Sequence, residues 1–287
     1  MNTARRYSWL ACLVLLTGCH LFQHTGGGNE HADKEPAPDL PGKYNVRISQ
    51  FVFRSDVELR QDQPVCKDLS RHREDIYREL RLPASNTDIF VCLFQDQWHF
   101  EKFMKAKYPY LPNRRAFFVA QPRRLGGTED LMVYTFWGER LQQDLRHELT
   151  HAILHSVLKD VPIWLDEGLA EYFEVPAGAD GVNPKHVELL RQAGVRFDLD
   201  RLEQLKEINQ MTPAEYRESW AWTHLMLRST PRAKQALLSY LQDLRTNPTP
   251  GPLHPRLAPA FLSLDGALQT HLADLERKLP ATATARQ

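Results

Sequence analysis

Two histidines and a glutamate stand close together in the segment 145–155, LRHELTHAILH. His147 and His151 are four residues apart, so on an α-helix both imidazoles leave the same face, one turn apart. This spacing lets both side chains bind one tetrahedral zinc ion. Glu148 lies about 100° around the helix, where it is not an equivalent ligand but can accept a proton from a water in the open metal position. The segment therefore predicts a metal site with its own general base.

A second helical segment, IWLDEGLAEYF at 163–173, begins after Pro162 and carries Glu167 and Glu171 among large apolar residues. Coming soon after H-E-x-x-H, the string W-L-x-E-G-x-A-E-Y resembles the gluzincin zinc metallopeptidases. The resemblance implies that Glu167 is the third zinc ligand. It also implies that Glu171, one turn later, orients a ligand histidine. Exchanged roles for the two acids are the alternative.

More narrowly, the chain resembles the bacterial peptidase-MA-like group that includes the DUF1570 family, which adds a later Tyr-x-x-x-Trp-Ala helix. Here that string is YRESWAWTH at 216–224. The resemblance implies that Tyr216 or His224 donates a hydrogen bond to the developing oxyanion. The alternative is that both simply pack in one helix stripe. By the same analogy, strand 131–136 is an edge strand that binds the substrate backbone.

His155 continues the four-residue series but is not expected to bind the same metal. It lies two turns beyond His147, roughly 12 Å along the axis at 1.5 Å per residue, so one zinc ion cannot contact all three histidines. We expect His155 to be packed, or to hydrogen-bond a ligand.

The N-terminus has the features of an export signal. Arg5 and Arg6 precede an apolar run at 9–16, which is far shorter than the roughly 20 residues that span a bilayer. The run ends in Leu-Thr-Gly before Cys19 and resembles the bacterial lipoprotein box. That resemblance implies a signal peptide at 1–18 and lipidation of Cys19, whereas a membrane anchor or an ordinary signal is the alternative. His20 after Cys19 favours the periplasmic face of the outer membrane over the inner membrane.

Two further cysteines, Cys66 and Cys92, remain after the signal. In an oxidising envelope compartment they can form a disulfide, and two buried thiols are the alternative. Residues 19–42 contain Gly26-Gly27-Gly28 and three prolines, which is typical of a flexible tether. We expect a disordered tail at 280–287.

The remainder, 43–279, predicts a single catalytic α+β domain with a strand-rich half at 43–140 and a helical half at 141–279. The expected strands are 44–52, with a continuation at 57–59, then 88–94, 115–120 and 131–136. The expected helices before the metal segment are 62–82 and 97–107; a proline-rich loop at 247–259 and a last helix at 261–279 follow it. The resemblance implies a thermolysin-like zincin fold with the H-E-x-x-H helix between a mixed sheet and the helical half.

Charge gives no indication of a nucleic-acid partner, because 36 basic residues balance 36 acidic ones and no basic run exceeds a pair. The sequence thus predicts an envelope-anchored, zinc-dependent metallopeptidase that acts on peptides or proteins. A non-catalytic lipoprotein that uses the same scaffold for binding or assembly is the alternative.

Overall fold

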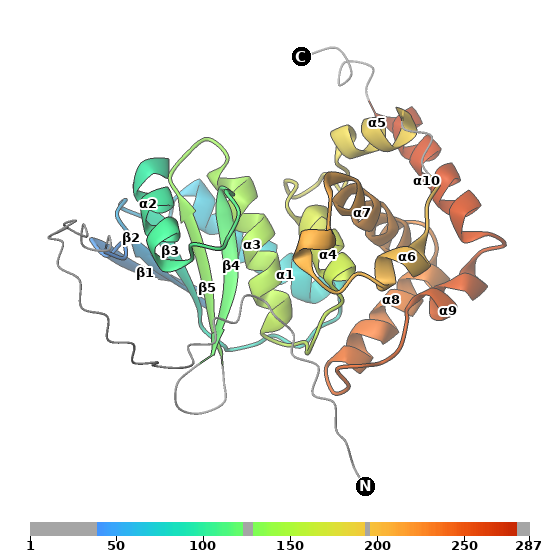
Figure 1. The fold of residues 1–287 in the computed structure, drawn as a ribbon, viewed down its shortest axis with the longest axis horizontal. Helices are drawn as coiled ribbons and strands as arrows, with labels where there is room; N and C mark the ends of the chain where they lie inside the picture. Colours follow the sequence, from blue (N-terminus) through green and yellow to red (C-terminus); the bar gives the residue numbers. More distant parts are fainter. Residues whose placement is uncertain (1–38, 123–128, 193–195, 280–287) are drawn as a thin grey trace, which may run out of the picture.

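The chain folds as an α+β protein, shown in Figure 1, with one mixed five-stranded sheet and ten α-helices in the part that the structure describes. This computed structural model describes residues 39–122, 129–192 and 196–279. The predicted signal peptide with Cys19, most of the predicted tether and the predicted tail lie outside these ranges. Among the described residues, no helix combines the length and apolar character that a bilayer crossing needs.

The sheet has the strand order β1-β2-β3-β5-β4. Its three inner strands β2, β3 and β5 are parallel, and both outer strands are antiparallel to their neighbours. The strands are β1 (Tyr44–Ile48), β2 (Phe51–Ser55), β3 (Ile89–Phe94), β4 (Ala116–Pro122) and β5 (Glu129–Phe136).

The first predicted strand is in fact a hairpin. Ile48 pairs with Phe51, and Ser49, with φ of +56°, begins the two-residue turn between β1 and β2. Before the turn the buried residue Ile48 has an even number, and after it the buried residues Phe51, Phe53 and Ser55 have odd numbers. A single strand across 44–52 would keep its buried residues on positions of one parity, so the predicted alternation did not reveal the turn. No strand forms at 57–59, so the expected continuation was wrong.

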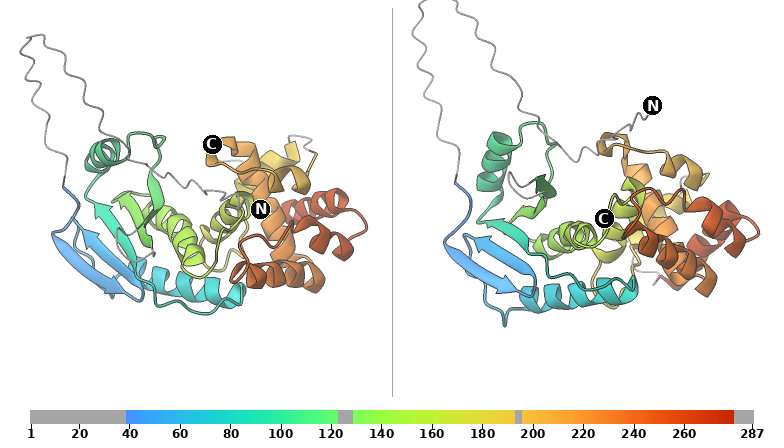
Figure 2. Two further views of the ribbon diagram at one scale, coloured as in Figure 1. Left: turned by 60° about the horizontal axis from the view of Figure 1, so that its bottom comes forward. Right: turned by 90° about the horizontal axis from the view of Figure 1, so that it is seen from below.

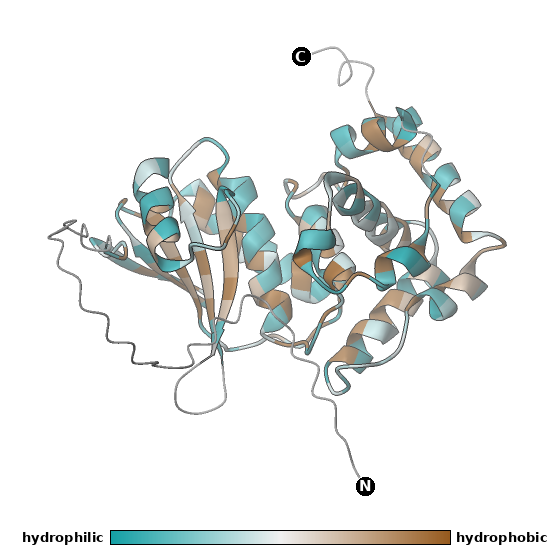
Figure 3. Ribbon diagram, in the orientation of Figure 1, coloured by the Kyte–Doolittle hydropathy of each residue, from teal (hydrophilic) through white to brown (hydrophobic). Residues whose placement is uncertain are grey.

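The two faces of the sheet carry different helices. Helices α1 (Pro64–Glu79) and α3 (Leu141–His155) share one apolar core with Ile89, Val91 and Leu93 of β3. Helix α2 (Gln97–Lys107) covers the opposite face, where Cys92 and Phe94 point. The inner strands β3 and β5 are largely apolar on both faces because both faces are covered there, as the hydrophobic colours of the central strands in Figure 3 show.

This arrangement rules out the predicted disulfide. Cys66 lies in α1 and belongs to the core on one face of the sheet, whereas Cys92 of β3 points to the other face. Both residues are buried free cysteines. Burial raises the pKa of the Cys92 thiol to about 12, so this thiol stays protonated.

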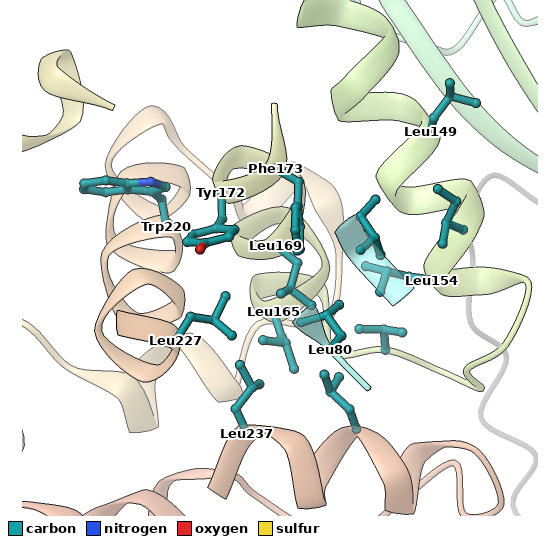
Figure 4. Close-up of a cluster of buried hydrophobic side chains, with 14 of the residues drawn as sticks. Leu80, Leu149, Leu154, Leu165, Leu169, Tyr172, Phe173, Trp220, Leu227 and Leu237 are labelled. Carbon is teal, nitrogen blue, oxygen red and sulfur yellow. The ribbon is translucent and has the colours of Figure 1, made fainter. Parts of the chain in front are cut away.

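The helical half is built around α4 (Ile163–Phe173), which packs between α3 and α7 (Pro213–Arg228). Figure 4 shows leucines and aromatic residues of these helices converging with Leu80 and with Leu237 of α8 (Pro231–Leu244). The other helices are α5 (Pro184–Gln192), α6 (Leu199–Glu203), α9 (His254–Leu257) and α10 (Leu264–Lys278). The predicted loop at 247–259 thus contains a short helix, since Pro255 is compatible with a first helical turn.

Helix α1 joins the two halves. In Figure 2 it runs from the sheet to the helical half, and near its end Glu79 pairs with Lys234 of α8 at 2.8 Å. The sheet and the helices therefore hold α3 between them, and α3 carries both candidate ligand histidines.

Candidate metal centre

Helices α3 and α4 bring the three predicted ligands together. Nε2 of His147 lies 3.3 Å from Nε2 of His151. Oε2 of Glu167 lies 3.5 Å from the first nitrogen and 3.6 Å from the second. The three atoms form a nearly equilateral triangle, and these three residues are a group that can hold a metal ion.

The size of this triangle fits a tetrahedral zinc site. Zinc binds imidazole nitrogen and carboxylate oxygen at about 2.0–2.1 Å, which gives ligand–ligand edges of about 3.3–3.4 Å in a tetrahedron. Oε2 of Glu167 is buried and has no hydrogen-bond partner among the described residues. A buried carboxylate oxygen without a partner is costly, and a cation in the triangle would satisfy it.

The charged groups of the triangle also interact strongly with one another. Burial alone would lower the pKa of His151, but the charges of Asp166 and Glu167 outweigh it and raise that pKa to about 10. Burial would likewise raise the pKa of Glu167, but the neighbouring histidines lower it to about 2. The site therefore favours an anionic carboxylate beside a protonated histidine, and a metal ion that binds there would displace that proton.

Both ligand histidines have a carboxylate at the ring nitrogen that faces away from the triangle. Nδ1 of His147 donates to Oε2 of Glu174 at 3.1 Å, and Glu174 in turn accepts from the Gln143 side chain at 2.8 Å. Oδ2 of Asp166 lies 3.0 Å from Nδ1 of His151. A proton on Nδ1 leaves Nε2 with a free lone pair for the metal. Nδ1 of His147 donates such a hydrogen bond, whereas Nδ1 of His151 lies beside the Asp166 carboxylate without forming a hydrogen bond.

Glu171, predicted to orient a ligand histidine, has a different partner. Its Oε2 accepts from Nε2 of His186 at 2.7 Å, so the choice of Glu171 was wrong and Glu174 takes that position. Glu174 bonds His147 of α3, and Glu171 bonds His186 of α5. The ligand atoms of Glu171, Glu174 and His147 still lie within 4.8 Å of one another, so these residues form a second group that could hold a metal ion. The oxygen that completes the triangle comes from Glu167, not Glu171.

His155 is not a metal ligand but is linked to one. Its Nε2 donates to Oδ2 of Asp166 at 3.1 Å, the same oxygen that lies beside His151. The Phe118 ring of β4 lies against both histidine rings, with centroids 5.1 Å and 6.2 Å away. The packed position expected for His155 thus also anchors Asp166.

Glu148 faces an open cleft of roughly 410 Å³, which His147 also lines. Burial raises the pKa of Glu148, and the nearby histidines only partly offset this effect. A carboxylate with a raised pKa is a stronger base and is suited to accept and return a proton.

Tyr216 lies in the same cleft, whereas His224 does not. The Tyr216 hydroxyl donates to Oε1 of Glu167 at 3.4 Å and accepts from Nη2 of Arg114 at 2.8 Å. His224 is buried two turns further along α7 and hydrogen-bonds His271 at 2.8 Å. Of the two predicted oxyanion candidates, only Tyr216 is placed beside the metal ligands.

The start of α7 explains this position of Tyr216. Thr212 and Glu215 form a capping box, and Pro213 occupies the first turn. These residues begin the helix just before Tyr216. The tyrosine therefore lies in the first turn of α7, at the mouth of the cleft.

The edge strand next to the metal helix is β4, not the predicted segment 131–136. That segment lies in β5, which pairs with β3 on one side and with β4 on the other. Both β4 and β5 pack against α3. The chain order suggested β5, because β5 directly precedes α3. In the structure β5 pairs antiparallel with the preceding strand β4, and β4 occupies the edge of the sheet.

Comparison with known proteins finds a family model that matches part of this region. Residues 143–250 match the family described as protein of unknown function (DUF1570). The match runs from α3 through α8 and contains all three candidate ligands, Glu148 and Tyr216. No curated protein matches the chain.

Proposed function

We propose that the protein is a zinc-dependent metallopeptidase of the gluzincin type, with a zincin-like fold. The observation that carries the proposal is the triangle of His147, His151 and Glu167, whose edges of 3.3–3.6 Å suit tetrahedral zinc. The presence of Glu148 in the adjoining cleft supports hydrolysis rather than a purely structural metal. In structural zinc sites the protein supplies all four ligands, whereas the described residues supply three to this triangle.

A zinc ion held by these ligands would supply Lewis acidity, polarising a substrate carbonyl and lowering the pKa of a water molecule. Glu148 accepts the proton of the attacking water and passes it to the leaving nitrogen as the peptide bond breaks. The water thus supplies hydroxyl to the new carboxylic acid and hydrogen to the new amine. The raised pKa of Glu148 assists both transfers.

Tyr216 is proposed to stabilise the developing oxyanion. Burial and the charge of Glu167 raise the pKa of its phenol, so it stays protonated and can donate a hydrogen bond. Its partner Arg114 places a positive charge at the same point. Such preorganised donors lower the barrier because negative charge develops next to them.

The first test is the zinc content of the purified protein beside a His147→Ala variant. We expect about one zinc per chain in the protein and none in the variant. Absence of zinc from both, after excess zinc has been offered, would refute the metallopeptidase assignment.

The second test separates catalysis from metal binding. Glu148→Gln should retain zinc and lose peptide hydrolysis, because the amide cannot accept the proton. Glu74→Gln is the matched control, since Glu74 is exposed on α1, away from the cleft, and should not change activity. Equal hydrolysis by Glu148→Gln and the protein would contradict this mechanism. Zinc binding without hydrolysis of any peptide by the protein would favour a non-catalytic binding role.

We also propose that the protein is a lipoprotein anchored in the cell envelope through Cys19, in the outer rather than the inner membrane. The support is the order of Arg5 and Arg6, the apolar run 9–16 and the Leu-Thr-Gly-Cys string. Mass spectrometry of the mature N-terminus should find an acylated Cys19. An unmodified N-terminus at residue 1 would refute the proposal.

A further inference from the structure

The cleft beside the metal centre is lined by four arginines that come from three separate parts of the chain. Arg114 and Arg115 precede β4, Arg140 precedes α3, and Arg217 lies in α7 next to Tyr216. Their convergence on one cleft results from the tertiary fold, because 25 or more residues separate the three parts in sequence.

Of the four acids that line the same cleft, three are hydrogen-bonded to other side chains and the fourth is the proposed general base. Asp144 accepts from Arg115 at 3.0 Å. Glu171 pairs with His186, and Glu174 accepts from His147 and Gln143. The fourth acid, Glu148, is the proposed general base. Among the four arginines, only Arg115 therefore forms a close ion pair with an acid that lines the cleft.

The other three arginines have no carboxylate within ion-pair distance in the part of the chain that the structure describes. Arg114 donates to the Tyr216 hydroxyl, and Arg140 donates to the Gln143 side chain at 3.1 Å. Arg217 is partly buried and has no hydrogen bond or ion pair among the described residues. Most of the donors of these guanidinium groups are therefore available to a ligand in the cleft.

We propose that Arg114, Arg140 and Arg217 bind a carboxylate of the substrate, so that the enzyme prefers peptides with an acidic group close to the cleaved bond. The proposal rests on the proposed function and names its substrate class. The planar guanidinium fork matches a carboxylate and binds it through two hydrogen bonds. The group lies near the cleaved bond because Arg114 contacts Tyr216, whose hydroxyl reaches a ligand carboxylate.

Two sources supply this chemistry, a free peptide C-terminus and an Asp or Glu side chain. The probes are acetylated pentapeptides of alanine and leucine in matched sets. One set has Glu at each position in turn, a second has Gln there instead, and each peptide is made with a free or an amidated C-terminus. Binding is measured by calorimetry to the zinc-loaded Glu148→Gln variant, and cleavage is measured with the unaltered protein.

We expect a carboxylate-bearing peptide to bind roughly 10- to 100-fold more tightly than its uncharged counterpart, as is typical of hydrogen bonds to charged groups. If amidation of the peptide abolishes the tighter binding, the bound carboxylate is the C-terminus. If exchange of Glu for Gln abolishes it, the bound carboxylate is the side chain. Arg217→Gln should reduce the preference at least tenfold, whereas the control Arg71→Gln, on an exposed face of α1, should leave it intact.

Equal binding of charged and uncharged peptides, or no binding of any acidic peptide, would overturn the proposal. The proposed function would survive either result if the unaltered protein cleaved the peptides. Conversely, carboxylate-dependent binding that Arg217→Gln abolishes, without any cleavage, would support the carboxylate site and refute the peptidase.

Discussion

Replacement of Gly168 by alanine is expected to open the contact between the two helices that build the site. Gly168 follows the ligand Glu167 on α4 and faces α7. A Cβ added there would lie 2.5 Å from the Ser219 carbonyl oxygen and 2.5 Å from Oγ1 of Thr223. One of these atoms is backbone, so a change of rotamer cannot relieve the overlap, and the helices must separate.

The required movement follows from these distances. Ordinary contact begins at 3.4 Å, so α7 must move by about 0.9 Å relative to α4. The hydrogen bond from Tyr216 to Glu167 is already 3.4 Å long and would not survive such a movement. Overpacking of this kind costs about 1–3 kcal/mol, and the better helix propensity of alanine returns about 1 kcal/mol. We expect a net loss of about 1 kcal/mol, and at most about 2 kcal/mol, together with weaker zinc binding.

Thermal unfolding of the zinc-loaded protein measures the effect. At about 2–4 °C per kcal/mol, Gly168→Ala should lower Tm by roughly 2–4 °C, and by at most about 8 °C. Gly266→Ala is the matched control, because it also lies in a helix, and its Cβ would meet nothing closer than 3.4 Å. The control should keep or slightly raise Tm. A Gly168→Ala protein as stable as the parent, with unchanged zinc affinity, would refute this account of the packing.

Three other outcomes follow from the described contacts. Asp166→Asn and Glu174→Gln should each lower zinc affinity roughly 10- to 100-fold in competition with a chromophoric chelator, since each removes a carboxylate from a ligand histidine. Burial lowers the pKa of His72 to about 4, so the unfolded chain takes up this proton first as the pH falls below about 6.5. The contribution of His72 to stability is therefore complete above that pH, and its protonation should lower the free energy of unfolding by about 2 kcal/mol by pH 5. His72→Gln should flatten the pH dependence of the urea midpoint between pH 8 and 5. Cys66 and Cys92 should react with a thiol reagent only after unfolding, and a reductant should not shift the unfolding midpoint.

The sequence predicted best what lies within one helix. The segment 97–107 forms α2 with the predicted bounds, since Asp96 caps its first turn and the apolar residues follow helical spacing. The pair His147 and His151 depends only on the geometry of α3, so its shared face was also predictable. The predicted third ligand, Glu167, completes the triangle with them in the structure.

Contacts between elements were harder to predict. Asp166 and Glu174 stand on either side of the predicted acids, and their contacts with the ligand histidines depend on how closely α4 approaches α3. That distance is set by side-chain packing, which no periodic pattern records. The hairpin at Ser49 was missed because neither Ser49 nor Gln50 is a strong turn residue.

Arg114 gives the clearest case of a residue whose position depends on the whole fold. It precedes the edge strand of the sheet, yet it contacts Tyr216, which is 102 residues later in the chain. The segment 143–250 that matches a protein family contains the metal ligands and the proposed base but not Arg114. The cleft therefore combines Arg114 and Arg140, which precede the matched segment, with Arg217 and the candidate metal ligands, which lie within it. Only the packing of α3 between the sheet and α4 brings them together.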